Sequence, residues 1–151
     1  MKKPLQTCCG QKVRDYRLDD QVGYKLRLAT QRHLEIFSRR IANLTPTQFS
    51  VLVRLDEVGE VSQNQLGRLV AMDAATTKGV VKRLIEKGFV SSKRDKEDVR
   101  RLQISLTSEG KQEITKCIKD AKKITEETTS TLTKDEITQL LFLLDKLEKK
   151  F

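Results

Sequence analysis

The sequence predicts a mainly α-helical fold with one small β-hairpin, and three observations predict it. Apolar residues recur at helical spacing through most of the 151 residues. Residues 89–94 and 101–106 have the composition of two short strands, and a charged stretch separates them. The last helical segment carries an apolar band too wide for a lone amphipathic helix, so it must pack against another element.

The composition favours a globular cytoplasmic protein. With 37% hydrophobic and 34% charged residues, the chain is too apolar for a disordered protein and too polar for a membrane protein. Its longest apolar run, 140–144, is far below the roughly 20 residues that a membrane span needs, so no membrane partner is expected. Three cysteines and one histidine form no pattern typical of a disulfide framework, metal site or catalytic triad. The sequence therefore predicts no enzyme, metal or cofactor.

The net charge of +9 is unevenly distributed along the chain. Residues 1–44 carry a net +6 and residues 62–101 a net +5, whereas residues 102–151 are neutral. The excess at 62–101 coincides with a recognisable arrangement of helices and strands, and it makes an anionic partner plausible there.

The N-terminal third predicts a flexible tail followed by a long helix. Residues 1–18 lack a pattern, and apolar residues then recur at helical spacing from Asp19 to about Ala42. We assign residues 19–44 to an N-terminal dimerisation helix, because its apolar stripe needs a partner surface.

Three further helices follow, each with a starting signal. Thr45 is a good N-cap before Pro46, Ser62 begins a short helix, and Asp73 caps a helix that ends before Gly88. Two short helices joined by a tight turn, the second more basic, are typical of a helix-turn-helix.

A hairpin completes the central region. Strands are predicted at 89–94 and 101–106, joined by the charged loop 95–100. A helix-turn-helix followed by a charged hairpin makes a winged helix, so residues 45–107 are predicted to form a winged helix-turn-helix domain.

The C-terminal residues 108–151 predict two more helices, the last opened by a capping box at Thr133 and Glu136. The fold class is thus mainly α with a small β wing, flanked by N- and C-terminal dimerisation helices. We expect the two ends of the chain to pack together across a homodimer interface.

Residues 19–150 resemble the MarR family of bacterial winged helix-turn-helix regulators, most specifically over 44–107. The matching segments are Leu44-Thr45-Pro46-Thr47-Gln48-Phe49, the recognition-helix segment from Met72 to Val81, and the wing Arg94-Asp95-x-x-Asp98-x-Arg100. The resemblance implies a homodimer with a recognition helix in the major groove of double-stranded DNA and a wing beside the minor groove. It also implies a repressor, or less often an activator, that a small ligand releases from DNA.

The expected DNA-binding residues lie at two helix starts and in the wing. The N-terminal turns of a recognition helix meet base edges, and basic side chains neutralise phosphates. By resemblance, Arg100 enters the minor groove and Asp98 braces it. The full set of DNA-binding candidates is Ser62, Gln63, Thr76, Thr77, Lys78, Lys82, Arg94, Arg100 and Arg101.

The resemblance also implies an effector cleft between the dimerisation helices and the winged domain. A cationic cleft would suit an aromatic carboxylate, because arginine offers two parallel hydrogen bonds to a carboxylate. The alternative is that Arg32, Arg40 and Arg54 are ordinary surface or interface residues. The candidates are Arg32, His33, Phe37, Arg40, Phe49 and Arg54.

Two other functions stay open. In a thiol-based redox sensor, Cys8 and Cys9 would react, aided by nearby lysines. Residues 18–24 resemble the segment that carries the reactive cysteine of the family's organic-hydroperoxide sensors, but this chain has Gly23 at that position. A non-specific nucleoid-type binder is the third hypothesis, and it would not prefer one operator over random duplex.

Overall fold

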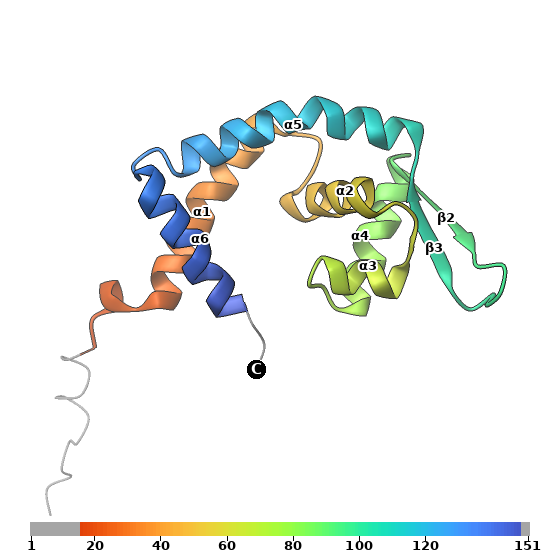
Figure 1. Cartoon of the computed structure of the whole chain (residues 1–151), viewed down its shortest axis with the longest axis horizontal. Coiled ribbons are helices and arrows are strands. Elements are labelled where there is room, and N and C mark those ends of the chain that lie inside the picture. The colour runs from red at the N-terminus through yellow and green to blue at the C-terminus, as the bar shows by residue number, and fades with distance from the viewer. Residues whose placement is uncertain (1–15, 149–151) are drawn as a thin grey trace, which may run out of the picture.

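The computed structural model describes residues 16–148 and confirms a mainly helical winged helix-turn-helix fold. In Figure 1 the long helix α5 runs along the top, with the winged domain beneath one end and α1 and α6 beneath the other. The elements in chain order are a 3₁₀ turn at Leu18–Asp20, α1 (Val22–Arg40), α2 (Pro46–Val58), β1 (Val61–Ser62), α3 (Gln63–Leu69), α4 (Ala74–Glu86), β2 (Val90–Arg94), β3 (Leu102–Leu106), α5 (Ser108–Thr128) and α6 (Lys134–Glu148).

The first long helix is shorter than the predicted 19–44. A 3₁₀ turn at Leu18–Asp20 precedes it, and the N-cap Gln21 has extended backbone, so α1 begins only at Val22. It ends at Arg40, where Ile41 leaves the helical conformation. The predicted apolar stripe is correct in its C-terminal half, where Ile36 and Phe37 are buried.

The helix starts of the winged domain follow the predicted caps. The Thr45 hydroxyl accepts from the Gln48 backbone N–H at 3.2 Å, and the Gln48 side chain accepts from the Thr45 N–H at 3.1 Å. The Ser62 hydroxyl likewise accepts from the Gln65 N–H at 3.2 Å. These bonds satisfy backbone donors that a helix leaves unpaired in its first turn, which fixes where α2 and α3 begin.

The sheet has three antiparallel strands in the order β1-β3-β2, one more than the hairpin predicted. Residues Val90 to Arg94 pair with Leu106 to Leu102 as expected. The additional strand pairs Val61 with Ile104 and Ser62 with Gln103. It anchors the segment between α2 and α3 to the wing.

The core of the winged domain lies between α2, α3, α4 and β3. Its fully buried apolar side chains include Leu52, Leu55, Leu66, Leu84 and Ile104. Burying such side chains contributes about 1.5–3 kcal/mol each to stability. This core holds the recognition helix and the wing in a fixed relation.

The start of α5 packs closely on the end of the winged domain. The Thr107 hydroxyl donates to the Gly88 carbonyl at 2.6 Å and accepts from the Gly110 N–H at 3.0 Å. Gly88 itself adopts a φ of 77°, as its predicted position after α4 requires. The bonds of Thr107 therefore join the end of the recognition helix to α5.

The last helix buries none of its residues within the protomer. Its exposed apolar side chains include Leu140, Leu143 and Leu147, which follow helical spacing i, i+3 and i+7 and so share one face. Across residues 16–148, no helix combines the length and apolar character that crossing a membrane requires.

Candidate functional site

Helix α4, which the resemblance implies is the recognition helix, presents polar side chains at its N-terminal end. Asp73 caps it, accepting from the Thr76 backbone N–H at 2.7 Å and from the Thr76 hydroxyl at 3.0 Å. These two hydrogen bonds hold the pKa of Asp73 below its ordinary value of 3.8. Thr76, Lys78 and Lys82 are exposed on this helix. Nζ of Lys82 lies 4.0 Å from Oε1 of Glu86.

Thr77, which the sequence placed among the DNA-binding residues, is instead a core residue. Its side chain is only 1% exposed, and its hydroxyl donates to the Asp73 carbonyl at 2.7 Å. A Cβ on Gly67 would lie 2.8 Å from the Thr77 hydroxyl, so the glycine allows α3 to approach α4 here. The prediction for Thr77 was wrong, because the helix turns its side chain toward α3.

The wing loop is organised by Asp95, to which the sequence assigned no role. Its carboxylate accepts from the backbone N–H groups of Glu97 at 2.8 Å and Asp98 at 3.1 Å, and from the Gln103 side-chain amide. The bond from Gln103, followed by the two backbone bonds, holds the pKa of Asp95 below 3.8. The charged form of Asp95 therefore stabilises the closed wing loop.

Asp98, which we expected to brace Arg100, contacts the backbone of Arg100 and the side chain of Arg101. It accepts from the backbone N–H of Arg100 at 3.0 Å, and its other oxygen lies 3.4 Å from Nε of Arg101. The Arg100 side chain makes no ion pair within residues 16–148, so its guanidinium is available to an external anion. Arg94 crosses the loop to the Val99 carbonyl at 3.5 Å.

A polar hollow of about 330 Å³ between α3 and the wing brings four of the predicted DNA-binding residues together. Four of its lining residues were missed, the polar Asn64, Gln65 and Arg68 and the apolar Leu102. Arg68 lies about one helical turn after Gln65 and therefore on the same face of α3, so its place beside the hollow could have been predicted from this spacing. The residues that line the hollow are Ser62, Gln63, Asn64, Gln65, Arg68, Arg100, Arg101 and Leu102.

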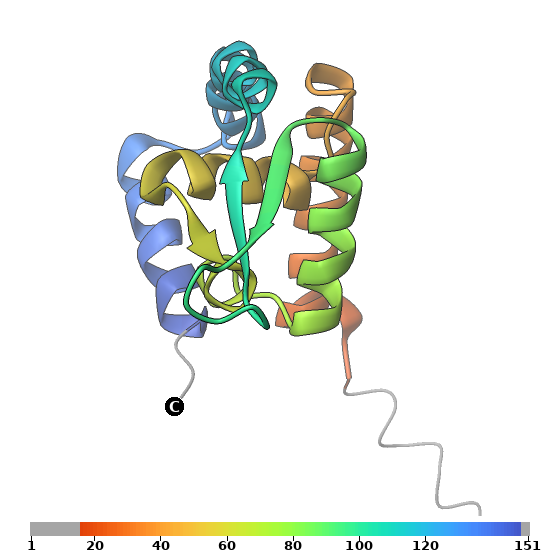
Figure 2. The same cartoon turned by 90° about the vertical axis from the view of Figure 1, so that its right-hand side faces the viewer.

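These features share one end of the winged domain. Figures 1 and 2 both show the N-terminal end of α4 and the tip of the β2–β3 hairpin at the lower end of the domain, away from α5. The arrangement offers a helix end and a neighbouring basic loop on one face, which fits a major groove and the adjacent minor groove of a duplex.

Three of the predicted effector-cleft residues form a row of rings where α1, α2 and α5 meet. The ring of Phe37 lies 6.4 Å from that of His33 and 6.0 Å, edge to face, from that of Phe49. Nδ1 of His33 lies 3.0 Å from the Thr128 hydroxyl of α5. These rings join the helices at the junction and leave little of Phe37 exposed.

The arginines predicted for the same cleft do not gather there. Arg40, together with Arg39, pairs with Glu127 at 2.7 and 2.6 Å, and these bonds lower the pKa of Glu127. Arg54 pairs with Glu57 on α2. Arg32 lines a separate hollow beside Glu127. The predicted cationic cleft of six residues is thus divided among three places.

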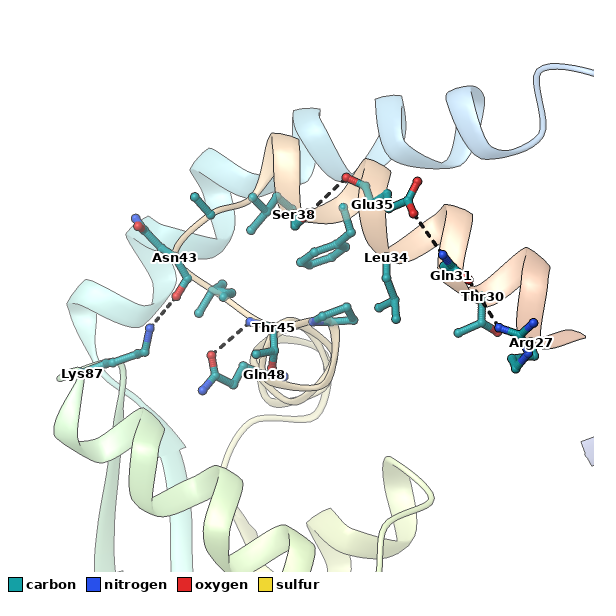
Figure 3. Close-up of a pocket in the computed structure, with 15 residues that line it drawn as sticks. Arg27, Thr30, Gln31, Leu34, Glu35, Ser38, Asn43, Thr45, Gln48 and Lys87 are labelled. Atoms are coloured by element: carbon teal, nitrogen blue, oxygen red, sulfur yellow. Dashed lines mark hydrogen bonds between the residues drawn. The ribbon is translucent and has the colours of Figure 1, made fainter.

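A larger cavity of about 970 Å³ lies between α1, the connection from α1 to α2, and the end of α4. Figure 3 shows Leu34 and Ser38 of α1 on one side and Lys87 on the other. Among the predicted effector residues, only Phe37 lines it. The polar lining residues that sequence analysis missed include Arg27, Asn43, Gln48 and Lys87. The cavity lies where α1 meets the winged domain.

Comparison with known proteins decides the family. The family model for the MarR family matches residues 44–102. A curated relative, the HTH-type transcriptional repressor NicR of Pseudomonas putida, is 35% identical over 134 residues, covering 87% of this chain and 85% of NicR. The chain belongs to the MarR family. Its curated relatives are transcriptional regulators, so this MarR-family protein is a transcriptional regulator.

Solved structures of regulators share the fold. A probable transcriptional regulator from Pseudomonas aeruginosa is 47% identical with a TM-score of 0.84, covering 87% of this chain and 99% of that one. Bordetella bronchiseptica BpsR, whose DNA binding is regulated by 6-hydroxynicotinic acid, is 33% identical with a TM-score of 0.86, covering 90% of this chain and 99% of BpsR.

The hypothesis of a thiol-based redox sensor finds no reactive cysteine among residues 16–148 of this MarR-family protein. Cys8 and Cys9 lie outside residues 16–148, so their reactivity stays a prediction. Cys117 is buried in α5, and burial together with the nearby Glu113 carboxylate raises the pKa of its thiol. A raised pKa leaves less thiolate, the reactive form.

Proposed function

We propose that this protein is a ligand-responsive, sequence-specific DNA-binding repressor that acts as a homodimer on a pseudo-palindromic operator. The supporting observation is the common face formed by the N-terminal end of α4 and the wing (Figure 2). Thr76 and Lys78 would meet base edges, and Arg100 would enter the minor groove. Ser62, Gln63, Arg94 and Arg101 would contact phosphates or support those contacts.

Dimerisation is supported by apolar surface that a lone protomer leaves in water. On α1, Val22 is 66% exposed and Leu26 42% exposed. On α6, Leu143 and Leu147 are 47% and 65% exposed. Exposed apolar surface on a helix of a folded protein is typical of an association site. A two-fold axis through these helices would present two recognition helices to half-sites about 34–36 Å apart.

Response to a ligand is supported by the 970 Å³ cavity between α1 and the winged domain. A volume of this size can hold a small organic molecule. The DNA binding of the related BpsR is regulated by 6-hydroxynicotinic acid, an aromatic carboxylate. We propose the same ligand class for this protein.

The test is binding to the DNA upstream of the protein's own gene, measured by fluorescence anisotropy against a random duplex of equal length. We expect tighter binding to the upstream DNA and a steep fall in affinity with salt, because phosphate contacts release counterions. Arg100→Ala should weaken operator binding by about 1–3 kcal/mol.

Lys119→Ala is the matched control, since Lys119 is an exposed cation on α5. An equal loss of operator affinity in Arg100→Ala and Lys119→Ala would mean that the net positive charge of the protein, and not the wing, is responsible for binding. A salt slope near zero would contradict DNA binding altogether. Equal affinity for random duplex would instead support the non-specific binder.

A further inference from the structure

We propose that Val99, at the tip of the wing, makes the wing prefer A·T to G·C base pairs, because its apolar side chain gives the amino group of guanine no hydrogen-bond partner in the minor groove. The inference rests on the proposed DNA binding and deepens it. It assigns base-pair specificity to one residue and names the chemical group on DNA that this residue rejects.

Val99 is an exposed apolar residue in an otherwise charged loop. The loop between β2 and β3 covers residues 95–101, and Val99 is its only apolar residue. Its exposed fraction is 63%, so its methyl groups lie in water in the free protein. Removing apolar surface from water is favourable, which makes Val99 suited to a contact that forms only when the wing meets a partner.

Hydrogen bonds within the loop hold the backbone around Val99 in place. The guanidinium of Arg94 donates to the Val99 carbonyl at 3.5 Å. The Asp98 carboxylate accepts the N–H of Arg100 at 3.0 Å, and the Asp98 carbonyl accepts the N–H of Arg101 at 2.8 Å. Because valine is branched at Cβ, its side chain also has few rotamers. The wing therefore presents Val99 as a fixed apolar group.

Arg100 brings this apolar group to the minor groove. Among residues 16–148, Asp98 accepts the backbone N–H of Arg100, but no hydrogen bond or ion pair engages the Arg100 guanidinium. Val99 directly precedes Arg100, and both residues are exposed. The Asp98 carboxylate, which phosphates would repel, is turned toward the Arg100 N–H and Nε of Arg101. The wing tip thus offers the groove one cation and one adjacent apolar group.

These two groups fit the two kinds of base pair differently. In the minor groove an A·T pair presents only acceptors, whereas a G·C pair adds the N2 amino donor of guanine. The acceptors can bind the N–H groups of Arg100. Against the methyl groups of Val99, the amino group would lose its water partners without gaining an acceptor. A donor left unsatisfied in this way weakens binding, so Val99 disfavours G·C under the wing.

Threonine at the same position isolates this effect. Threonine has nearly the shape of valine, but its hydroxyl can accept a hydrogen bond from the amino group. Val99→Thr therefore keeps the size of the side chain and the cation of Arg100, and it supplies the acceptor that guanine lacks. We expect this variant to tolerate G·C under the wing.

Selection of duplexes from a random pool by the full chain locates the base pairs that the wing reads. They are the positions whose preference is present in the wild type and lost in Arg100→Ala. We expect the wild type to select A·T at these positions. Val99→Thr should select G·C there roughly five times as often as the wild type does.

Base analogues then separate the amino group from the rest of the base pair. An inosine·C pair keeps the major-groove groups of G·C but lacks the N2 amino group, and a diaminopurine·T pair adds that group to A·T. By fluorescence anisotropy, G·C and diaminopurine·T at a wing-contacted position should each weaken wild-type binding about tenfold relative to A·T, and inosine·C should stay within about twofold. In Val99→Thr the tenfold losses should shrink to about threefold.

Val58→Thr is the matched control, because Val58 is a 45% exposed valine at the end of α2, outside the wing. It should discriminate against G·C as the wild type does. The inference is overturned if the wild type binds inosine·C as weakly as G·C, if Val99→Thr keeps the full discrimination, or if Val58→Thr loses it as well. It is also overturned if no position depends on Arg100, because the wing then reads no base pair.

The same selection distinguishes this inference from the proposed function. A protein that selects an operator but shows none of the Val99 effects refutes this inference alone. A protein that selects no sequence from the pool refutes sequence-specific DNA binding, and the inference with it.

Discussion

Gly110 shows how one residue fixes the junction between the winged domain and α5. A Cβ at this position would lie 2.0 Å from the carbonyl oxygen of Phe89. That oxygen also accepts the backbone N–H of Thr107 at 3.1 Å, so it cannot move aside without cost. The absence of a side chain at residue 110 is what lets the first turn of α5 pack against the end of α4 and β2.

Gly110→Ala is therefore expected to lower the free energy of unfolding by roughly 2–3 kcal/mol, the cost of overpacking against a fixed backbone. Urea denaturation measures it. Gly79→Ala is the control, because a Cβ there meets nothing within 4 Å and alanine favours a helix by about 0.5–1 kcal/mol. If both variants are equally stable, the close approach at Gly110 does not exist in solution.

Neighbouring residues on α4 have opposite roles. Lys78 is exposed, whereas Thr77 is buried against Gly67. Lys78→Ala should weaken operator binding about tenfold and reduce the salt slope by about one, with little effect on stability. Thr77→Ser should lower stability but leave operator affinity within about twofold. A large loss of DNA affinity in Thr77→Ser but not in Lys78→Ala would show that Thr77 contributes to DNA binding after all.

At the scale of elements, local signals made most of the fold predictable. The caps Thr45, Ser62 and Asp73 form the bonds that their positions in the sequence imply. The two-residue strand β1 was missed because it exists only through pairing with β3, some 40 residues away in the chain. The composition of residues near β1 does not indicate which distant strand it pairs with.

The site was less predictable than the fold, for the same reason. The exposed wing residues could be named from the loop sequence. Which side of α4 faces α3 depends on how the two helices pack, and the sequence does not show this. Thr77 was therefore assigned to the DNA-binding face although it is buried against α3. The cavity depends on Lys87 meeting Asn43, 44 residues distant, and nothing near either residue indicates that contact. Arg40 was assigned to a cleft because the sequence does not reveal its distant partner Glu127, whereas the pairing of Arg54 with Glu57, three residues further on the same helix, could have been read from the sequence.

The wing loop is expected to depend on the ionisation of Asp95. Its folded pKa is depressed, so the stabilisation is present well above pH 3.8 and is lost as the pH falls through the folded value. Carboxyl NMR titration should place the pKa of Asp95 below 3.8. Gln103→Leu should raise it, because Gln103 provides the largest stabilising bond.

The stability of Asp95→Asn should correspondingly change less with pH than that of the wild type as the pH falls below 3.8 and through the lowered pKa of Asp95. Asp56→Asn is the control, since Asp56 is an exposed carboxylate of α2 that makes no hydrogen bond within the described residues. Identical pH profiles for Asp95→Asn and the wild type would show that the charge of Asp95 does not support the loop.

At the scale of the whole molecule, charge and apolar surface are segregated from residue 62 onward. The basic excess of residues 62–101 belongs to the domain with α4 and the wing, whereas residues 102–151 are neutral and carry the apolar face of α6. The apolar face of α6 can pack against an apolar face of another copy, which would remove both faces from water. The segregation fits a molecule that binds an anionic duplex with one part and itself with another.

Leu143→Glu tests that arrangement. A carboxylate on the face shared by Leu140, Leu143 and Leu147 would be buried without a partner in a dimer, a cost of several kcal/mol. We expect sedimentation equilibrium to show a dimeric wild type and a monomeric variant. Operator affinity should fall with it, because one winged domain can occupy only one half-site. Val58→Glu is the control, since Val58 is 45% exposed at the end of α2, outside this face. A dimer that survives Leu143→Glu but dissociates in Val58→Glu would place the interface on the winged domain.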